Sequence, residues 1–285
     1  PEKADKGAGI IDRMLDSATM GGIETFVANN NTSLTAIVIF STAATIRKIL
    51  SEDNMIISTP VTLRANPNNS EARCGCRINV LPLPISINSS ETILESLKKT
   101  TAALWSGIEY RNYSFNNLLK ELNIDREIGL YNVMAEFIDE DSKKNKFITI
   151  PNNTARLDLS LSLIKKENNY LLHVEYDKSK ITDDYASAIS KVFELILGQI
   201  ISFPNHKIAS LHMCSEAEEK KIIELGKGKS LNCDTDIIGR IIKVAKNSPN
   251  KVAVIHNNKT ITYKELLLLS ANIRENLRKQ KIKKG

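Results

Sequence analysis

Two runs of alternating apolar and polar residues constrain the fold more than any other feature of this sequence. The first is Leu157 to Leu163 (LDLSLSL), and the second is Tyr170 to Tyr176 (YLLHVEY). Alternation with a period of two is typical of a strand with one buried face, because successive side chains point to opposite faces. The polar residues 166–169 separate the two runs, so the pattern predicts an antiparallel hairpin whose leucines face a core.

The other apolar patterns predict helices and strands mixed along the chain. Helices are predicted over 32–50, 88–105, 183–201, 215–225, 237–246 and 264–279, and further strands over 55–61, 78–85, 130–138, 252–256 and 260–263. Asn257 and Asn258 can occupy left-handed turn positions that join the last two strands in a hairpin. Pro82 and Pro84 cannot donate to a ladder, so their strand is expected at a sheet edge. The mixture indicates an α/β fold with a mixed sheet and flanking helices.

Helix starts and buried faces can also be predicted. Asn88, followed by Glu91, is expected to cap the helix that ends at Trp105, and Thr182 or Asp183 the helix over 183–201. In the helix over 183–201, the side chains predicted to face inward are Tyr185, Ile189, Phe193, Ile196 and Ile200.

The positive charge of the chain is concentrated near its C-terminal end. The formal net charge is +6, yet residues 236–285 alone contain 12 Lys or Arg and 3 Asp or Glu. A basic segment can indicate nucleic-acid binding. However, 28 of the 39 basic residues are Lys and aromatic residues are only 5% of the chain. Few guanidinium or stacking groups are therefore present to contact bases, and no nucleic-acid partner is predicted.

No motif for catalysis, cofactor binding or metal binding is present. The four cysteines are Cys74, Cys76, Cys214 and Cys233. They are too few for a disulfide scaffold and do not have zinc-site spacing. The first histidine is His173, so residues 1–172 offer no imidazole as a general base. We therefore expect no catalytic, cofactor-binding or metal-binding residue.

The sequence also lacks signals for a membrane. No apolar run approaches the ~18 residues that a spanning helix needs. The N-terminus (PEKADKG) has no charged start followed by an apolar stretch, and it does not begin with Met, as is usual for chain starts inside larger proteins. We expect a cytoplasmic location and no membrane partner.

Several motifs occur in an order that resembles the condensation domains of nonribosomal peptide synthetases. Thr59 to Arg64 (TPVTLR) and Gly75 to Leu83 (GCRINVLPL) resemble the signatures G-x-P-x-x-x-R and I-G-x-F-V-N-T-L-P-L. Tyr110 to Phe115 is a weakened H-Q-D-Y-P-F, and Leu157 to Leu161 resembles F-D-L-x-L. The matching positions that we take as candidate tunnel-wall or structural residues are Pro60, Arg64, Gly75, Asn79, Tyr113, Phe115 and Asp158.

The C-terminal end resembles the start of an adenylation (AMP-binding) domain. Thr260 to Leu266 (TITYKEL) is similar to that family's first signature, L-T-Y-x-E-L, and Pro249 to Val254 (PNKVAV) stands where the family has P-x-x-x-A-V. The positions that carry the match are Thr262, Tyr263, Glu265 and Leu266. The resemblance implies a C-terminal condensation lobe over 1–211, a linker over 212–235 and an N-terminal adenylation fragment over 236–285.

The resemblance also implies a fold and a reaction. Condensation domains are similar to chloramphenicol acetyltransferase, with two lobes and a tunnel in which thioesters on carrier proteins form an amide bond. Residues 1–211 would be one chloramphenicol-acetyltransferase-like lobe, and 236–285 a small α+β fragment. The family's H-H-x-x-x-D-G motif belongs to the other lobe and is absent here. The segment is therefore expected to be inactive alone and to bind no cofactor.

The complete enzyme implied by the resemblance would use phosphopantetheine on its carrier proteins, and ATP and Mg for adenylation. The implied partners are the upstream and downstream peptidyl carrier domains, the N-terminal lobe of the condensation domain and the rest of the adenylation domain.

The motif residues are expected to be mainly structural. Asp158 lies on the polar face of its strand, where it could pair with an arginine such as Arg64 or be simply exposed. Asn79 could orient a thioester or satisfy backbone groups near the two prolines. A structural role is expected for Tyr263 and Glu265.

Two other functions are compatible with these patterns. One is a free-standing acyltransferase of the same superfamily, which would not explain the adenylation-like motifs. The other is a degenerate, non-catalytic docking or scaffold module, which the weakened motif at Tyr110 to Phe115 would suit. An H-H-x-x-x-D-G motif upstream of Pro1 would favour an active condensation domain over a scaffold.

Limited proteolysis should cut first near Lys227 or Lys229 and leave a resistant fragment of about 1–225. Gly226 and Gly228 lie in a polar stretch without apolar periodicity, so we expect a hinge over 226–236. About fifty residues follow, a size at which burial alone is marginal. Mass spectrometry of the fragments tests this prediction, and equal protection on both sides of 226–236 would contradict it.

Overall fold

The computed structural model describes residues 7–16, 20–63, 77–125, 129–140, 153–167, 169–228 and 236–282. The chain forms two compact units, Pro1–Lys220 and Lys221–Gly285, which divide within helix α7 (Glu216–Gly226). The strands of the first unit are β1 (Ala8–Met14), β2 (Asn54–Thr62), β3 (Ile78–Ser86), β4 (Val133–Asp139), β5 (Leu159–Lys166) and β6 (Asn169–Asp177). Its helices are α2 (Ile23–Asn30), α3 (Leu34–Leu50), α4 (Ile93–Glu109), α5 (Phe115–Glu121), α6 (Asp183–Ser202) and the short η1 (Ile208–Ser210).

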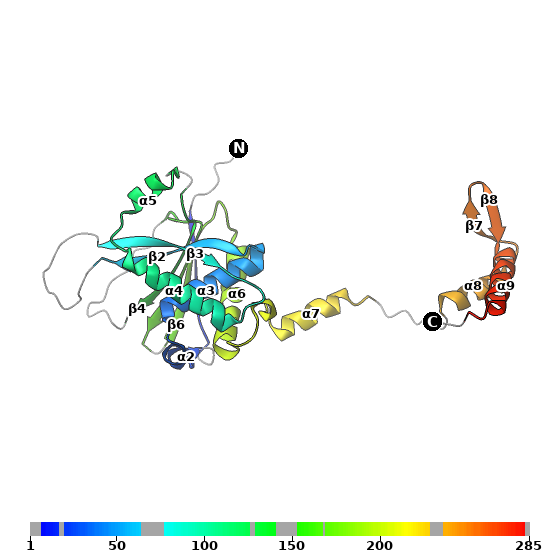
Figure 1. Ribbon diagram of the computed structural model, residues 1–285, viewed down its shortest axis with the longest axis horizontal. Helices are drawn as coiled ribbons and strands as arrows, with labels where there is room; N and C mark the ends of the chain where they lie inside the picture. Colours follow the sequence, from blue (N-terminus) through cyan, green and yellow to red (C-terminus); the bar gives the residue numbers. More distant parts are fainter. Residues whose placement is uncertain are drawn as a thin grey trace. The chain divides into compact units, whose positions relative to one another are not determined.

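The six strands form one mixed sheet in the order β1-β6-β5-β4-β2-β3. Figure 1 labels β2, β3, β4 and β6 of this sheet. β5 and β6 pair antiparallel, with Leu161 opposite Val174, which confirms the predicted hairpin. β4 lies parallel to both of its neighbours, β2 and β5. β3 is an edge strand, as predicted from Pro82 and Pro84. The α/β class with a mixed sheet and flanking helices is therefore confirmed for the first unit.

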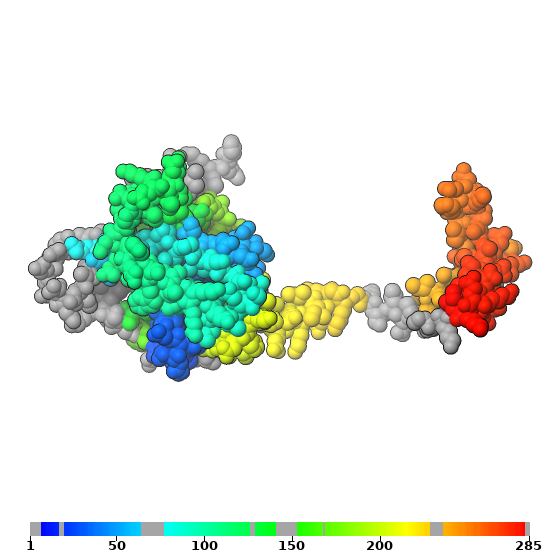
Figure 2. Space-filling model, viewed as in Figure 1, coloured from blue at the N-terminus to red at the C-terminus, as the bar shows by residue number. Residues whose placement is uncertain are grey.

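Helices α3, α4 and α6 pack on one face of this sheet and enclose the core. The leucines of β5 and the even-numbered apolar residues of β6 point into that core. Residues 36–45 of α3 are all buried, which makes α3 the central helix. In Figure 2, the atoms coloured cyan to green, which include α4, cover much of the near face of this unit.

No single described helix is long and apolar enough to cross a membrane. Taken together, α2 and α3 reach the required length and composition, but they are bent by 101° at the break between them. The buried residues of α3 instead face the protein core.

Most predicted boundaries agree with the structure, but three details of the helices differ. The cap of α4 is Thr92, which forms a capping box with Glu95, and Asn88 instead accepts a hydrogen bond from the backbone of Ser90. α4 continues past Trp105 to Glu109. Thr182 caps α6 as predicted, whereas Tyr185 is 43% exposed because it lies beside the buried stripe.

The sequence patterns did not predict β1, α2 or α5. β1 (AGIIDRM) has one fully buried residue, Gly9, and an exposed Ile10, so its apolar pattern is weak. Its position depends instead on pairing with β6. α2 and α5 have only eight and seven residues, too few for a clear helical period.

The second unit is small and has little core. It contains α8 (Ile237–Asn247), β7 (Val252–His256), β8 (Lys259–Thr262) and α9 (Tyr263–Lys279). β7 and β8 form the predicted hairpin, and Asn257 and Asn258 occupy left-handed positions in its turn, with φ of 45° and 61°. Among the described residues of this unit, only Ala245 is buried.

One glycine determines how β1 meets the core. Gly9 lies opposite Tyr176 of β6, and a Cβ atom at this position would lie 2.2 Å from Cζ of the tyrosine ring. Tyr176 is buried, and its hydroxyl donates to Oδ1 of Asp183 at 2.7 Å. Burial, together with this hydrogen bond, raises the pKa of Tyr176 to about 12. The ring cannot move away without breaking that contact.

Gly9→Ala should therefore lower the free energy of unfolding of the first unit by about 1–3 kcal/mol, the usual cost of overpacking. Trp105 of α4 is the single tryptophan and lies in this unit, so its fluorescence during urea unfolding measures the effect. Gly226→Ala is a suitable control, because its new Cβ would have no atom within 4 Å. Equal midpoints for Gly9→Ala and the parent protein would show that the ring moves freely.

Candidate functional site

The residues singled out by motif fall into three places in the structure. Pro60, Asn79, Tyr113 and Phe115 lie around one end of β3, whereas Asp158 lies before β5. The adenylation-like residues 262–266 lie in the second unit. Arg64 and Gly75 lie outside the described residues.

Asn79 joins two of the motifs. Its Nδ2 donates to the backbone carbonyl oxygens of Arg111 and Tyr113, both at 2.8 Å, and its Oδ1 accepts from the backbone N–H of Val80. One amide side chain thus fixes the turn between α4 and α5 against β3. Asn79 therefore satisfies backbone groups, but these belong to the turn after α4 and not to the part of β3 that contains Pro82 and Pro84.

Tyr113 and Phe115 hold the same region together by their side chains. The hydroxyl of Tyr113 donates to Oε1 of Glu121 at 2.5 Å, and this hydrogen bond raises the pKa of Tyr113. The ring of Phe115 lies 5.4 Å from the ring of Tyr131, at a tilted angle. Pro60 is adjacent to this group, because β2 places it opposite Val80.

Arg64, the partner suggested for Asp158, lies outside the described residues, and Asp158 forms an ion pair with a lysine. It lies just before β5, and its Oδ1 accepts from Nζ of Lys180 at 2.5 Å. The hydrogen bond raises the pKa of Lys180. Both side chains are partly exposed, so this ion pair contributes little to stability. The ion pair joins the start of β5 to the turn after β6.

In the second unit, Thr262 and Glu265 form the cap of α9. The Thr262 hydroxyl accepts from the Glu265 backbone, and Oε2 of Glu265 accepts from the Thr262 backbone at 2.8 Å. These hydrogen bonds lower the pKa of Glu265. Tyr263 donates its backbone N–H to Lys251, and Leu266 is half-buried. The geometry of these residues is that of a helix start.

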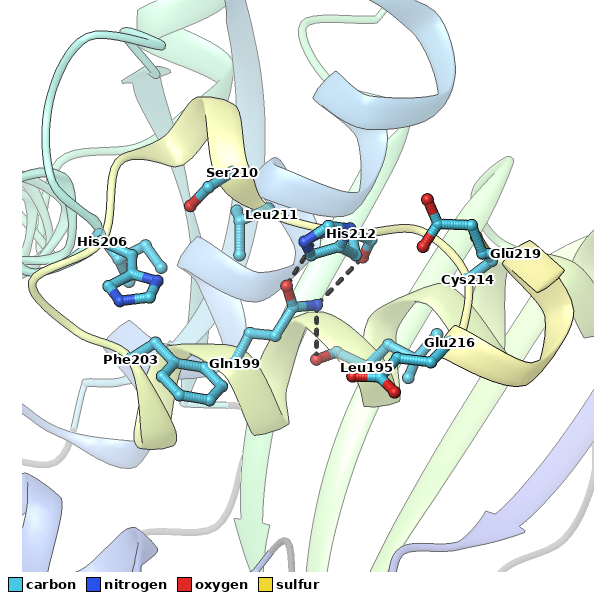
Figure 3. Close-up of a pocket in the computed structure, with 11 residues that line it drawn as sticks. Leu195, Gln199, Phe203, His206, Ser210, Leu211, His212, Cys214, Glu216 and Glu219 are labelled. Carbon is cyan, nitrogen blue, oxygen red and sulfur yellow. Dashed lines mark hydrogen bonds between the residues drawn. The ribbon is translucent and has the colours of Figure 1, made fainter. Parts of the chain in front are cut away.

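A pocket of about 430 Å³ lies where the chain leaves the first unit (Figure 3). Gln199 of α6 holds one wall in place: its side-chain amide donates to the carbonyl oxygen of His212 and accepts from the N–H of the same residue. Phe203 stacks on His206 with ring centroids 5.1 Å apart. The free thiol of Cys214 and the carboxylates of Glu216 and Glu219 line the opposite side. None of the candidate site residues from the sequence lies in this pocket.

The structure also aligns four polar side chains that the motifs did not predict. Asp12, His173, Ser162 and Glu136 occupy facing register positions on β1, β6, β5 and β4, and we call them the polar row. His173 Nδ1 lies 2.6 Å from Asp12 Oδ1, and the Ser162 hydroxyl donates to Glu136 Oε1 at 2.8 Å. The alternation of β5 and β6 placed Ser162 and His173 on a polar face, but only the strand order brings in Asp12 and Glu136.

The chemistry of these sites is limited. Among the described residues, no three His, Cys, Asp or Glu side chains form a group that could hold a metal ion. Asn79, Tyr113, Phe115 and Asp158 use their polar or aromatic groups in contacts within the protein. The polar row, in contrast, combines an imidazole, a hydroxyl and two carboxylates.

Asn79→Ala should release the turn between α4 and α5. Two carbonyl oxygens lose their donor, which should lower stability by about 1–2 kcal/mol. Hydrogen exchange should become roughly tenfold faster over 110–115 without a comparable change in β5. Asn112→Ala, an exposed position in the same turn, serves as the control. Unchanged exchange over 110–115 would show that the turn does not depend on Asn79.

Comparison with known proteins gives the family. Residues 1–223 match the family described as Condensation domain. The chain is 24% identical over 265 residues to Surfactin synthase subunit 2 of Bacillus subtilis (strain 168), covering 88% of this chain and 7% of that protein. It is 26% identical over 231 residues to Gramicidin S synthase 2 of Aneurinibacillus migulanus, covering 77% of this chain and 5% of that protein. The chain thus spans less than a tenth of the length of these relatives.

Solved structures share the fold at low identity. A four-domain nonribosomal peptide synthetase in its holo form, bound to AMP and glycine, has a TM-score of 0.69 at 16% identity and covers 100% of this chain and 23% of its own. The X-domain from teicoplanin biosynthesis has a TM-score of 0.67 at 16% identity and covers 74% of this chain and 51% of its own. Because the family match spans most of the sequence, the chain belongs to the condensation-domain family of nonribosomal peptide synthetases.

Proposed function

We propose that residues 1–211 are the C-terminal lobe of a condensation domain and help form the tunnel in which an amide bond is made. The reaction would join aminoacyl or peptidyl thioesters carried by two peptidyl carrier domains. The observation that carries this proposal is the family match over 1–223, together with a single helix-backed mixed sheet in the first unit. One lobe of this kind provides one wall, so the N-terminal lobe would be the partner that closes the tunnel.

The physical contribution of such a lobe would be positioning. Two tethered reactants held in one tunnel react as if at a very high effective concentration, because their association entropy has already been lost. The Asn79 contacts support this role, since they hold the turn after α4 rigidly on the edge strand. Phosphopantetheine would arrive on the carrier domains rather than bind to this segment permanently.

We further propose that residues 236–285 begin an adenylation domain, with 212–235 as the linker. The resemblance of Thr262, Tyr263, Glu265 and Leu266 to that family's first signature supports this proposal. So does the exposure of large apolar side chains in the described part of the second unit, which include Ile237, Ile238, Ile255, Leu268, Leu269 and Ile273. The rest of the adenylation domain would cover such side chains and would use ATP and Mg.

Two alternatives to this proposal remain, and the structure bears on each of them differently. A free-standing acyltransferase would leave the second unit without a role. A degenerate docking or scaffold module fits the fact that Tyr113 and Phe115 make contacts within the protein. Both alternatives can be separated from the main proposal by activity after addition of the missing lobe.

The isolated chain should form no dipeptide above background when mixed with two loaded carrier proteins. The proposal places the other wall and its histidines on the N-terminal lobe, so adding that lobe in trans should give product, detected by mass spectrometry of the carrier-bound thioester. Absence of product in both mixtures would favour a scaffold. Product from the isolated chain that is lost in His173→Ala would place the base in this lobe and overturn the proposal.

A further inference from the structure

The polar row lies on the sheet face opposite α3, α4 and α6. Facing register positions share one face of a sheet, and the neighbouring Leu161 and Val174 point to the helices. The row therefore points away from the helix layer. From Ser162 to the sheet edge the exposure increases: Ser162 is 4% exposed, His173 is half-buried, and the Asp12 side chain is 55% exposed.

With a neutral imidazole, the hydrogen bonds within the row leave it with acceptors only. A carboxylate can only accept, so the contact with Asp12 places the proton of a neutral His173 on Nδ1 and leaves the lone pair on Nε2. Ser162 uses its one proton on Glu136, so its oxygen can only accept further hydrogen bonds. Each of the two carboxylates also has a second oxygen that takes no part in these two hydrogen bonds.

Two basic residues close to the polar row in the sequence, Arg13 and Lys165, form ion pairs with carboxylates outside the row. Arg13 follows Asp12 but points to the helix face, where its Nε lies 2.7 Å from Glu194 of α6. Lys165 lies 2.5 Å from Glu24 of α2. Glu175 lies two residues from His173 on the same strand and the same face, which adds a third carboxylate. The chemistry that complements this surface is a cation with several N–H donors.

We propose that the polar row binds a primary ammonium group. An ammonium has three donors and no acceptor, which matches a row of acceptors flanked by two carboxylates. The ligand would lie over His173 and Ser162, between Asp12 and Glu136. That the natural ligand is the amino group of an aminoacyl thioester rests on the proposed function, and in that case the row positions the amine that attacks.

The full 285-residue chain can be tested by titration with glycinamide, followed in amide and imidazole NMR spectra. The row should show shifts at Asp12, His173 and Ser162 that saturate at roughly millimolar concentration, as expected for a few charge-assisted hydrogen bonds. N-acetylglycinamide lacks the ammonium, and tetramethylammonium has the charge but no N–H donor. Neither should shift these residues at constant ionic strength. Equal shifts with tetramethylammonium, or none with glycinamide, would overturn the proposal.

Substitutions then locate the site. Glu136→Gln keeps the shape of the side chain and removes one carboxylate, so it should weaken glycinamide binding about tenfold. Asp12→Asn, at the exposed edge, should have a similar effect and remains informative if Glu136→Gln fails to fold. Glu109→Gln removes an exposed carboxylate at the end of α4 and should leave binding unchanged. Unchanged affinity in both row variants would refute the assignment.

This outcome is independent of condensation activity. Amine binding without product after addition of the missing lobe would retain the row as an ammonium site and refute the proposed function. Suppose instead that product forms, and that neither Asp12→Asn nor Glu136→Gln changes glycinamide binding or the KM for the amine substrate. This result would support the proposed function and refute the ammonium site at the polar row.

Discussion

The register of the β5–β6 hairpin is the constraint on which the rest of the first unit depends. With Leu161 opposite Val174, the buried apolar side chains of the two strands point to the helix layer, while Ser162 and His173 face the other way. A slip by one residue would invert this arrangement, because side chains alternate between faces. The core and the polar row are therefore two consequences of one pairing.

The edge strands are held by local contacts of different kinds. β1 has no alternating apolar pattern of its own, and it fits at the sheet edge because Gly9 leaves room for the Tyr176 ring. β3 contains two prolines, which an edge position tolerates, and Asn79 ties it to the turn after α4. Each edge strand thus depends on one residue, Gly9 in β1 and Asn79 in β3, whereas the central strands depend on apolar packing.

The two units differ in how much of their apolar surface they bury. The first encloses a continuous core around α3, and most of the family match falls on this unit. The second has well-formed caps and a regular hairpin, yet nearly all of its large apolar side chains are at least partly exposed. Local hydrogen bonds can specify its secondary structure, but burial supplies most of the stability of a folded domain.

The sequence by itself determined the elements with strong periodicity: the β5–β6 hairpin, α3, α4, α6, the edge position of β3 and the small β7–β8 hairpin. These follow from local rules, namely the period of apolar residues, the missing N–H of proline and the tolerance of asparagine for left-handed turns. The short elements β1, α2 and α5 were not predicted, because their patterns are too short or too weak. Only the tertiary structure decided that Asn79 meets Tyr113, that Asp158 pairs with Lys180, and that Asp12, His173, Ser162 and Glu136 align. Those contacts depend on strand order and register between distant segments, for which a single sequence contains no local signal.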